Sequence, residues 1–129
     1  MRLLEYEAKN LLSACGMPIP RGKVFTANEL QAIVTPIVLK SQIPVGGRGK
    51  LGGVQIVRQQ SDIEAVARKI FDLKIKGFLP SKLLAEEILD IDREFYLSLT
   101  INRQTAAVEL LAHKLNRSEE RRVGKECRS

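Results

Sequence analysis

The chain has 129 residues, of which 44% are hydrophobic and 28% are charged, a composition typical of a globular domain with its own core. No apolar run approaches the roughly 20 residues of a membrane-spanning helix, and the acidic Glu5 and Glu7 exclude the pattern of a secretory leader. We therefore expect a cytoplasmic protein, or one of the mitochondrial matrix if the source is eukaryotic.

The formal net charge of +6 is distributed in a way that argues against a nucleic-acid interface. The last thirteen residues hold five basic and three acidic side chains, which leaves 16 basic against 12 acidic side chains in the rest of the chain. Aromatic residues make up 5% of the chain, too few for a base-stacking platform. The two cysteines, Cys15 and Cys127, provide neither a disulfide framework nor a metal-binding pair.

The first predicted element is a helix. Apolar residues recur at helical spacing from Leu4 to Cys15. Gly16 can end this helix in the left-handed conformation, and Pro18 and Pro20 prevent its continuation.

Two strands with a short helix between them are expected next. Residues 22–26 and the buried run 36–40 have the composition of strands, and a proline at the first strand position loses the least hydrogen bonding. A brief helix that ends at Val34 is expected between them, with Thr26 or Asn28 as its N-cap.

Residues 54–57 form the next predicted strand, and residues 61–64 match a capping box that opens a second helix. Lys74 and Lys76 are predicted in the last turn of that helix, where positive charge is favoured, with Gly77 closing it. The apolar stripe of this helix consists of Ile63, Val66, Ala67, Ile70 and Phe71.

Residues 82–89 and 94–101 are predicted strands, and the second turns at 102–105 into a returning strand over 106–112. One face of the first hairpin strand carries Phe95, Leu97, Leu99 and Ile101. The predicted fold class is therefore mixed α/β (α+β).

The segment Gly46–Gly53 has five glycines in eight positions, and it lies between two predicted strands. Glycine lets backbone N–H groups approach a ligand closely, and arrays of such groups bind anions. Arg48 and Lys50 lie inside the loop, and Lys40 ends the strand before it. This combination predicts a phosphate-binding loop.

Three known phosphate motifs match the loop loosely, and their structural contexts do not. A dinucleotide-binding G-x-G-x-x-G loop needs a helix after it, whereas a strand follows here. A P-loop needs Ser or Thr after Gly49-Lys50, and Leu51 stands there. A kinase loop needs a lysine on the next strand, and residues 54–60 contain none. A strand-to-strand phosphate flap remains, with a mobile glycine hairpin of no function as the alternative.

The chain resembles the β subunit of succinate–CoA ligase, a family of the ATP-grasp superfamily. The resemblance begins at Leu4-Glu5-Tyr6-Glu7-Ala8-Lys9 and is strongest in Val38-Leu39-Lys40-Ser41-Gln42 and Gly46–Val54. It continues through Leu84-Ala85-Glu86 and Arg93-Glu94-Phe95-Tyr96-Leu97, and it covers nearly all of residues 3–112. It implies an incomplete ATP-grasp fold, consisting of its N-terminal portion.

The resemblance implies a nucleotide-binding set made of Lys40, Gly47, Arg48, Gly49, Glu86, Leu89 and Glu94. In this set Lys40 contacts the phosphates and the loop closes over them. Glu86 lies where the adenine is recognised, Leu89 offers a backbone contact to the base, and Glu94 lies near the ribose. The alternative for Lys40, Glu86 and Glu94 is that they are ordinary solvent-exposed charges.

The implied activity of the parent enzyme is ligation of succinate and CoA driven by ATP or GTP, through succinyl phosphate and a phosphohistidine on a partner α subunit. The expected assembly is a heterodimer or heterotetramer with that subunit. The implied Mg²⁺ ligands lie beyond residue 116, so no catalytic or metal-binding residue is assigned here, and His113 is expected to have no catalytic role. A related ligase (malate–CoA ligase or a subunit of ATP-citrate lyase) and a non-catalytic nucleotide-binding module remain open.

Residues 117–129 are expected to be foreign to the protein. Arg117–Cys127 matches, residue for residue, the translation of a common short-read sequencing adapter. We therefore expect residues 1–116 to be an N-terminal fragment of an ATP-grasp domain, inactive by itself, followed by a non-native, disordered tail.

Overall fold

The computed structural model describes residues 2–115, which divide into one compact unit that ends at Leu89 and another that begins at Asp90. The tail predicted to be foreign lies outside the described residues. None of the helices within residues 2–115 is long and apolar enough to cross a membrane.

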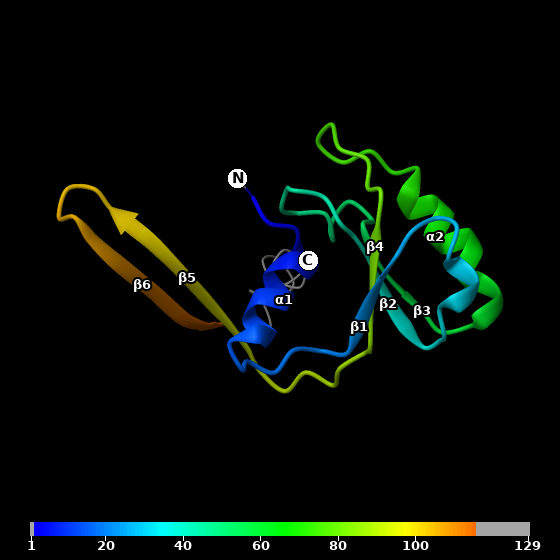
Figure 1. The fold of residues 1–129 in the computed structure, drawn as a ribbon, viewed down its shortest axis with the longest axis horizontal. Coiled ribbons are helices and arrows are strands. Elements are labelled where there is room, and N and C mark those ends of the chain that lie inside the picture. The colour runs from blue at the N-terminus through cyan, green and yellow to red at the C-terminus, as the bar shows by residue number, and fades with distance from the viewer. Residues whose placement is uncertain (1, 116–129) are drawn as a thin grey trace. The chain divides into compact units, whose positions relative to one another are not determined.

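A four-stranded antiparallel sheet forms the centre of the first unit (Figure 1). Its strands run in the order β1 (Gly22–Phe25), β4 (Leu83–Glu86), β2 (Ile37–Ser41) and β3 (Val54–Val57). All four strands were expected from the sequence. β4 is shorter than the predicted run to Leu89 because its last residue already pairs with the first residue of β1.

Helix α2 (Ile63–Phe71) packs against one face of this sheet. The predicted apolar stripe is confirmed, because Ile63, Ala67 and Ile70 are buried. The sheet side chains that meet them come from alternate strand positions, as a period of two requires. They include Phe25, Leu39, Val57, Leu83 and Ala85.

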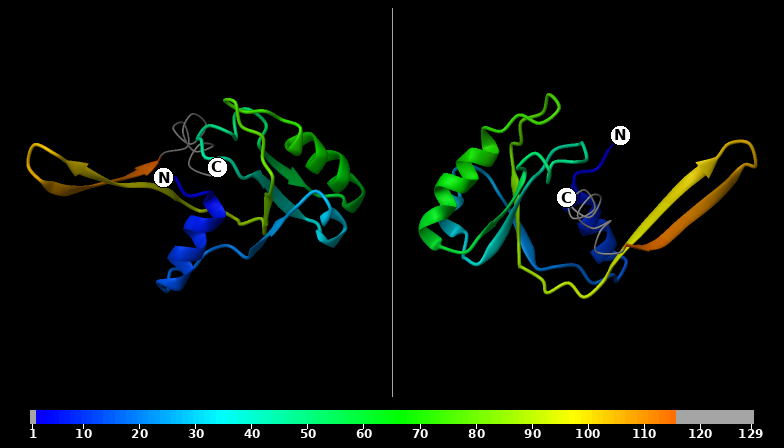
Figure 2. Two further views of the ribbon diagram at one scale, coloured as in Figure 1. Left: turned by 45° about the horizontal axis from the view of Figure 1, so that its top comes forward. Right: turned by 180° about the vertical axis from the view of Figure 1, so that it is seen from behind.

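Helix α1 (Glu5–Ala14) lies on the other side of the sheet from α2 (Figures 1 and 2). Its predicted end is confirmed. Gly16 has a φ of +85° and donates its N–H to Ser13, while Met17 donates to Leu12. This is the pattern of a Schellman cap. No residue of α1 is buried, so polar contacts hold it to the sheet.

Two predictions about the ends of α2 are wrong. Residues 60–62 form a 3-10 turn (η2, Gln60–Asp62) ahead of the helix, and the N-cap Asp62 makes no side-chain cap hydrogen bond. The helix ends at Phe71, before Lys74 and Lys76. Lys76 and Gly77 instead adopt φ values of +50° and +87° in a tight reversal. Two successive left-handed residues form a turn and cannot belong to a helix.

The short helix before β2 is a 3-10 turn (η1, Leu30–Ala32) that stops before Val34. Its N-cap is Glu29, so the prediction of Thr26 or Asn28 as the cap is wrong. The carboxylate of Glu29 accepts a hydrogen bond from the Thr26 amide, 3.0 Å away, which ties the loop to the turn. The turn places the buried Leu30 in the core beside α2.

The second unit is a hairpin of β5 (Glu94–Asn102) and β6 (Ala107–Leu115), drawn as the long two-stranded ribbon in Figure 2. The predicted hairpin is confirmed, and its returning strand continues to Leu115. His113 lies within β6 and stacks on Tyr96 with ring centroids 5.1 Å apart. The fold as a whole is the predicted mixed α/β (α+β) architecture.

Candidate functional site

The glycine-rich segment connects β2 to β3, as predicted. The Ser41 amide donates to the Gly53 carbonyl at 2.7 Å, which continues the strand pairing into the loop. The Arg48 carbonyl then accepts hydrogen bonds from Leu51 and Gly53 at 3.2 and 2.7 Å. The second half of the loop is therefore a closed turn. A Cβ at Gly53 would lie 3.0 Å from the Arg48 carbonyl oxygen, so a larger residue would crowd this turn.

The first half of the loop contains backbone N–H groups that are not used in hydrogen bonds between described residues. Gly47 has a φ of +77°, which favours glycine. Within residues 2–115, the N–H groups of Gly46, Gly47 and Gly49 have no hydrogen-bond acceptor. Unsatisfied N–H groups on consecutive glycine-rich backbone are a feature of anion-binding loops.

A cluster of five charged side chains lies on the α1 face of the sheet. It consists of Glu5 and Lys9 from α1, Lys40 from β2, Glu86 from β4 and Arg48 from the loop. Three cations and two carboxylates give it a net charge of +1. We call it the charge cluster.

Glu86 joins two cations in the charge cluster. Its side chain is 3% exposed, and its oxygens accept from Lys9 Nζ at 2.8 and 2.6 Å. Lys40 Nζ lies 2.8 Å from Glu86 Oε1. A carboxylate this deeply buried is tolerated because both oxygens have charged partners.

Glu5 contacts all three cations of the charge cluster. Its Oε1 lies 2.8 Å from Lys9 Nζ and 3.0 Å from Lys40 Nζ, and its Oε2 accepts from Arg48 Nη2. Burial acts to raise the pKa of Glu5, but the charges of Lys40, Arg48 and Lys9 outweigh it, so its pKa lies below the usual value. Burial acts to lower the pKa of Lys9, but its bonds to Glu5 and Glu86 hold that pKa above the usual value.

Arg48 is turned inward. It is 1% exposed, and its Nη1 donates to the Ser41 carbonyl while Nη2 donates to Glu5. Its Nε is buried without a hydrogen-bond partner among the described residues. The guanidinium therefore lies beneath the loop in this structure.

The structure brings together five of the seven residues predicted to bind nucleotide. Lys40, Arg48 and Glu86 meet in the charge cluster, and Gly47 and Gly49 lie in the adjoining loop. Lys40 and Glu86 are buried or nearly so, which overturns the alternative that they are ordinary exposed charges.

The other two predicted residues lie elsewhere along the chain. Leu89 follows β4 and is 50% exposed. Glu94 begins β5 in the second unit.

Sequence reasoning missed Glu5 and Lys9. Their i,i+4 spacing on a predicted helix was a signal that they pair with each other. It could not reveal that Glu5 also pairs with Lys40, 35 residues away, or that Lys9 also pairs with Glu86, 77 residues away.

Two hollows adjoin the charge cluster within the first unit. One, of about 400 Å³, is lined by Arg2, Leu3, Glu5, Ile43, Pro44, Val45, Gly46 and Arg48. The other, of about 350 Å³, has Lys9, Glu86 and Gly22 in its wall. The first hollow places Glu5 and Arg48 next to the opening glycine of the loop.

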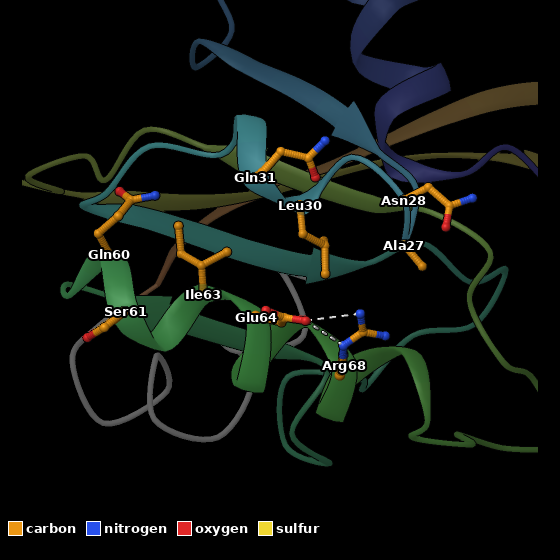
Figure 3. A pocket seen from close by; sticks show the side chains of 9 residues that line it. All are labelled: Ala27, Asn28, Leu30, Gln31, Gln60, Ser61, Ile63, Glu64 and Arg68. Atoms are coloured by element: carbon orange, nitrogen blue, oxygen red, sulfur yellow. Dashed lines mark hydrogen bonds and ion pairs between the residues drawn. The ribbon is translucent and has the colours of Figure 1, made fainter.

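A larger hollow of about 470 Å³ lies where η1 meets the start of α2, as Figure 3 shows. Three of its polar side chains are engaged with protein groups. Gln60 accepts from Thr35 and donates to the Ile33 carbonyl, and Glu64 pairs with Arg68. None of the predicted nucleotide-binding residues lines it, so it is not part of the candidate site.

Within residues 2–115, no group of three or more His, Cys, Asp or Glu side chains is placed to hold a metal ion. The described part of the site therefore offers cations and amides for an anion.

Comparison with solved structures supports the fold. The chain superimposes on the dinucleotide-forming acetyl-coenzyme A synthetase 1 of Ca. Korarchaeum cryptofilum, solved with coenzyme A, acetyl-coenzyme A and a phosphorylated phosphohistidine segment. The TM-score is 0.64 at 22% identity, covering 88% of this chain and 53% of that one. A second structure of that enzyme, with coenzyme A and Ca-AMPCP, gives a TM-score of 0.66 at 22% identity, covering 88% and 54%.

Sequence comparison finds closer relatives. The β subunit of succinate–CoA ligase [ADP-forming] from Ignicoccus hospitalis is 41% identical over 117 residues, and that from Pyrobaculum arsenaticum is 40% identical. The matching subunit from Syntrophobacter fumaroxidans is 38% identical over 125 residues. Each match covers 87% of this chain, which spans only 31 to 32% of the length of these relatives.

A family model described as the ATP-grasp domain matches residues 2–115, which is all but the start and the tail of the chain. The matched range includes the glycine loop and the whole charge cluster. The chain therefore belongs to the ATP-grasp domain family.

Proposed function

We propose that this chain forms the phosphate-binding part of the nucleotide site of a succinate–CoA ligase β subunit. The observation that carries the proposal is the β2–β3 loop. It leaves the amides of Gly46, Gly47 and Gly49 without acceptors within residues 2–115, directly after the strand that carries Lys40. The 38 to 41% identity to β subunits of this ligase supports the same assignment.

Each residue of the proposed set has a physical role. The ammonium of Lys40 has three donors, of which Glu5 and Glu86 accept two, so one N–H is left for a phosphate oxygen. The loop amides cradle the same phosphates. The resemblance placed Glu86 at the adenine. Because two ammonium groups hold this carboxylate, we assign it instead the role of fixing the position of Lys40.

The remaining members of the set complete the proposed nucleotide site. Gly47, Arg48 and Gly49 close over the phosphates. Leu89 offers a backbone contact to the base, and Glu94 contacts the ribose.

The nucleotide supplies the phosphoryl group for the reaction. In phosphoryl transfer the protein mainly positions the phosphates and balances their charge. The charge cluster, with its net charge of +1, suits that task. We propose ATP as the nucleotide, with GTP as the other candidate, and Mg²⁺ as its companion ion in the complete enzyme. Succinate and CoA are the proposed co-substrates.

The proposed partner is the α subunit of the same ligase, which would carry the phosphohistidine. The relatives are named as β subunits, and the superimposed synthetase was solved with a phosphohistidine segment. Such an enzyme would work in the cytoplasm or the mitochondrial matrix. A related acyl-CoA ligase of the ATP-grasp type remains the second candidate, because the superimposed enzyme is named an acetyl-coenzyme A synthetase.

Calorimetric titration of the 129-residue chain with ATP tests the proposal. We expect Lys40→Ala to weaken binding about 10- to 100-fold, since it removes a charge-assisted hydrogen bond of roughly 1.5–3 kcal/mol. The matched control is Lys69→Ala, an exposed lysine on α2. Equal affinity of both variants and the unaltered chain, with the fold intact by circular dichroism, would overturn the proposal.

A parallel titration with single-stranded DNA separates nucleotide binding from nucleic-acid binding. DNA affinity should fall steeply with salt because bound counterions are released. We expect ATP to bind more tightly than DNA at physiological salt. Tighter binding of DNA with a steep salt dependence would instead identify a nucleic-acid-binding module.

A further inference from the structure

Glu5 holds the two cations that the proposed function assigns to the phosphates. Its Oε1 lies 3.0 Å from Lys40 Nζ, and its Oε2 accepts from Arg48. The side chain is 16% exposed and lines the hollow that Gly46 also lines. One carboxylate therefore bridges two cations that come from a strand and from the loop that follows it.

A carboxylate and a phosphate present the same kind of acceptor to Lys and Arg donors. Arg48 donates Nη1 to Ser41 and Nη2 to Glu5, and it is 1% exposed. A phosphate can reach this guanidinium only when the bond to Glu5 is given up. Glu5 thus stands where an anionic ligand would stand.

We propose that Glu5 is an internal counter-ion of the nucleotide site, and that the phosphates of the nucleotide bind by displacing it from Lys40 and Arg48. This inference rests on the proposed function and deepens it. Glu5 lowers the affinity for anions in general, so weakly charged anions are excluded and a triphosphate can enter.

The way α1 is attached makes displacement feasible. No residue of α1 is buried, so a shift of the helix would expose no buried side chain of its own. Besides the charge cluster, the Tyr6 amide donates to Gln42 Oε1 at 3.1 Å and Arg2 donates to the Pro44 carbonyl at 3.3 Å. Polar contacts of this kind exchange for water at small net cost.

The decisive variant is Glu5→Gln, titrated with inorganic triphosphate and with ATP. Removing the competing charge raises the net charge of the cluster from +1 to +2, and we expect affinity to rise on the order of tenfold. A purely structural role for Glu5 would leave affinity unchanged or lower it. Either of those results would overturn the inference.

Glu64→Gln is a matched control. Glu64 is also an acid in the first turn of a helix, and it also pairs with a cation four residues on, Arg68. It has no contact with the charge cluster. We expect this variant to bind triphosphate as the unaltered chain does.

Hydrogen exchange on the unaltered chain provides a second test if Glu5→Gln does not fold. We expect inorganic triphosphate to speed exchange of the Tyr6 amide, because its bond to Gln42 depends on the docked position of α1. Unchanged or slower exchange would contradict displacement. If Lys40→Ala loses triphosphate binding and Glu5→Gln does not gain affinity, this inference alone is wrong. If Lys40→Ala leaves binding unchanged, the proposed function is wrong.

Discussion

Lys40 on β2 and Glu86 on β4 are diagonal neighbours on one face of the sheet, with Lys40 Nζ 2.8 Å from Glu86 Oε1. The register pairs Lys40 with Leu84, so Glu86 lies two residues further along the adjacent strand. Residues two apart on a strand share a face. The sheet thus places a largely buried cation and a buried carboxylate side by side, facing α1.

Removal of the Glu86 carboxylate should be costly to stability. Glu86→Leu removes one of the two carboxylates that pair with Lys9 and Lys40, whose ammonium groups are largely buried. We expect the free energy of unfolding to fall by about 3 kcal/mol. Urea denaturation followed by circular dichroism measures this change.

The neighbouring Glu87 provides the control for that measurement. Its partner Arg21 is 90% exposed, so Glu87→Gln should leave the unfolding midpoint unchanged. Equal losses for the two variants would mean that the charge cluster does not hold the first unit together.

The loop glycines should differ sharply in their tolerance of alanine. A Cβ at Gly53 would lie 3.0 Å from both the Arg48 carbonyl oxygen and Ile75 Cδ1, whereas one at Gly46 meets nothing within 4 Å. We expect Gly53→Ala to lower the free energy of unfolding by about 1–3 kcal/mol and Gly46→Ala to leave it nearly unchanged. Thermal unfolding of both variants compares them directly, and the reverse order would contradict the loop geometry.

Glu5 should make stability depend on acid pH. Because its pKa is lower in the folded chain, the unfolded chain binds more protons around the usual pKa of about 4.3, and stability rises with pH there. The contribution is complete above that pKa and is lost as pH falls through the lowered folded value.

Urea denaturation at a series of pH values tests this linkage. We expect the stability difference between the unaltered chain and Glu5→Gln to be largest near neutral pH and to shrink as the solution is acidified. A difference that grows on acidification would contradict the lowered pKa.

The sequence predicted the parts of the fold that depend on local pattern. The buried run of β2, the stripe of α2 and the cap at Gly16 follow from rules that act over a few residues. The glycine loop was found for the same reason, since its composition and the strands beside it are local features.

One failed prediction and one missed site residue were decided by contacts between distant residues. The expected capping box at 61–64 gave way to a 3-10 turn, because Gln60 bonds to Thr35 and to the Ile33 carbonyl and holds the chain there. Glu5 was missed as a site residue because its partners Lys40 and Arg48 are 35 and 43 residues away. Helical spacing carries no information about such pairs.

The proposed function requires the β2–β3 loop to bind phosphate through its amides. The most direct measurement is a two-dimensional amide NMR titration of the 129-residue chain with ATP. We predict that the resonances of Gly46, Gly47 and Gly49 shift together at one affinity, while those of Gly16 and Gly77, in turns outside the loop, stay in place. Loop resonances that stay unshifted at ATP concentrations that saturate other residues would contradict the proposed function.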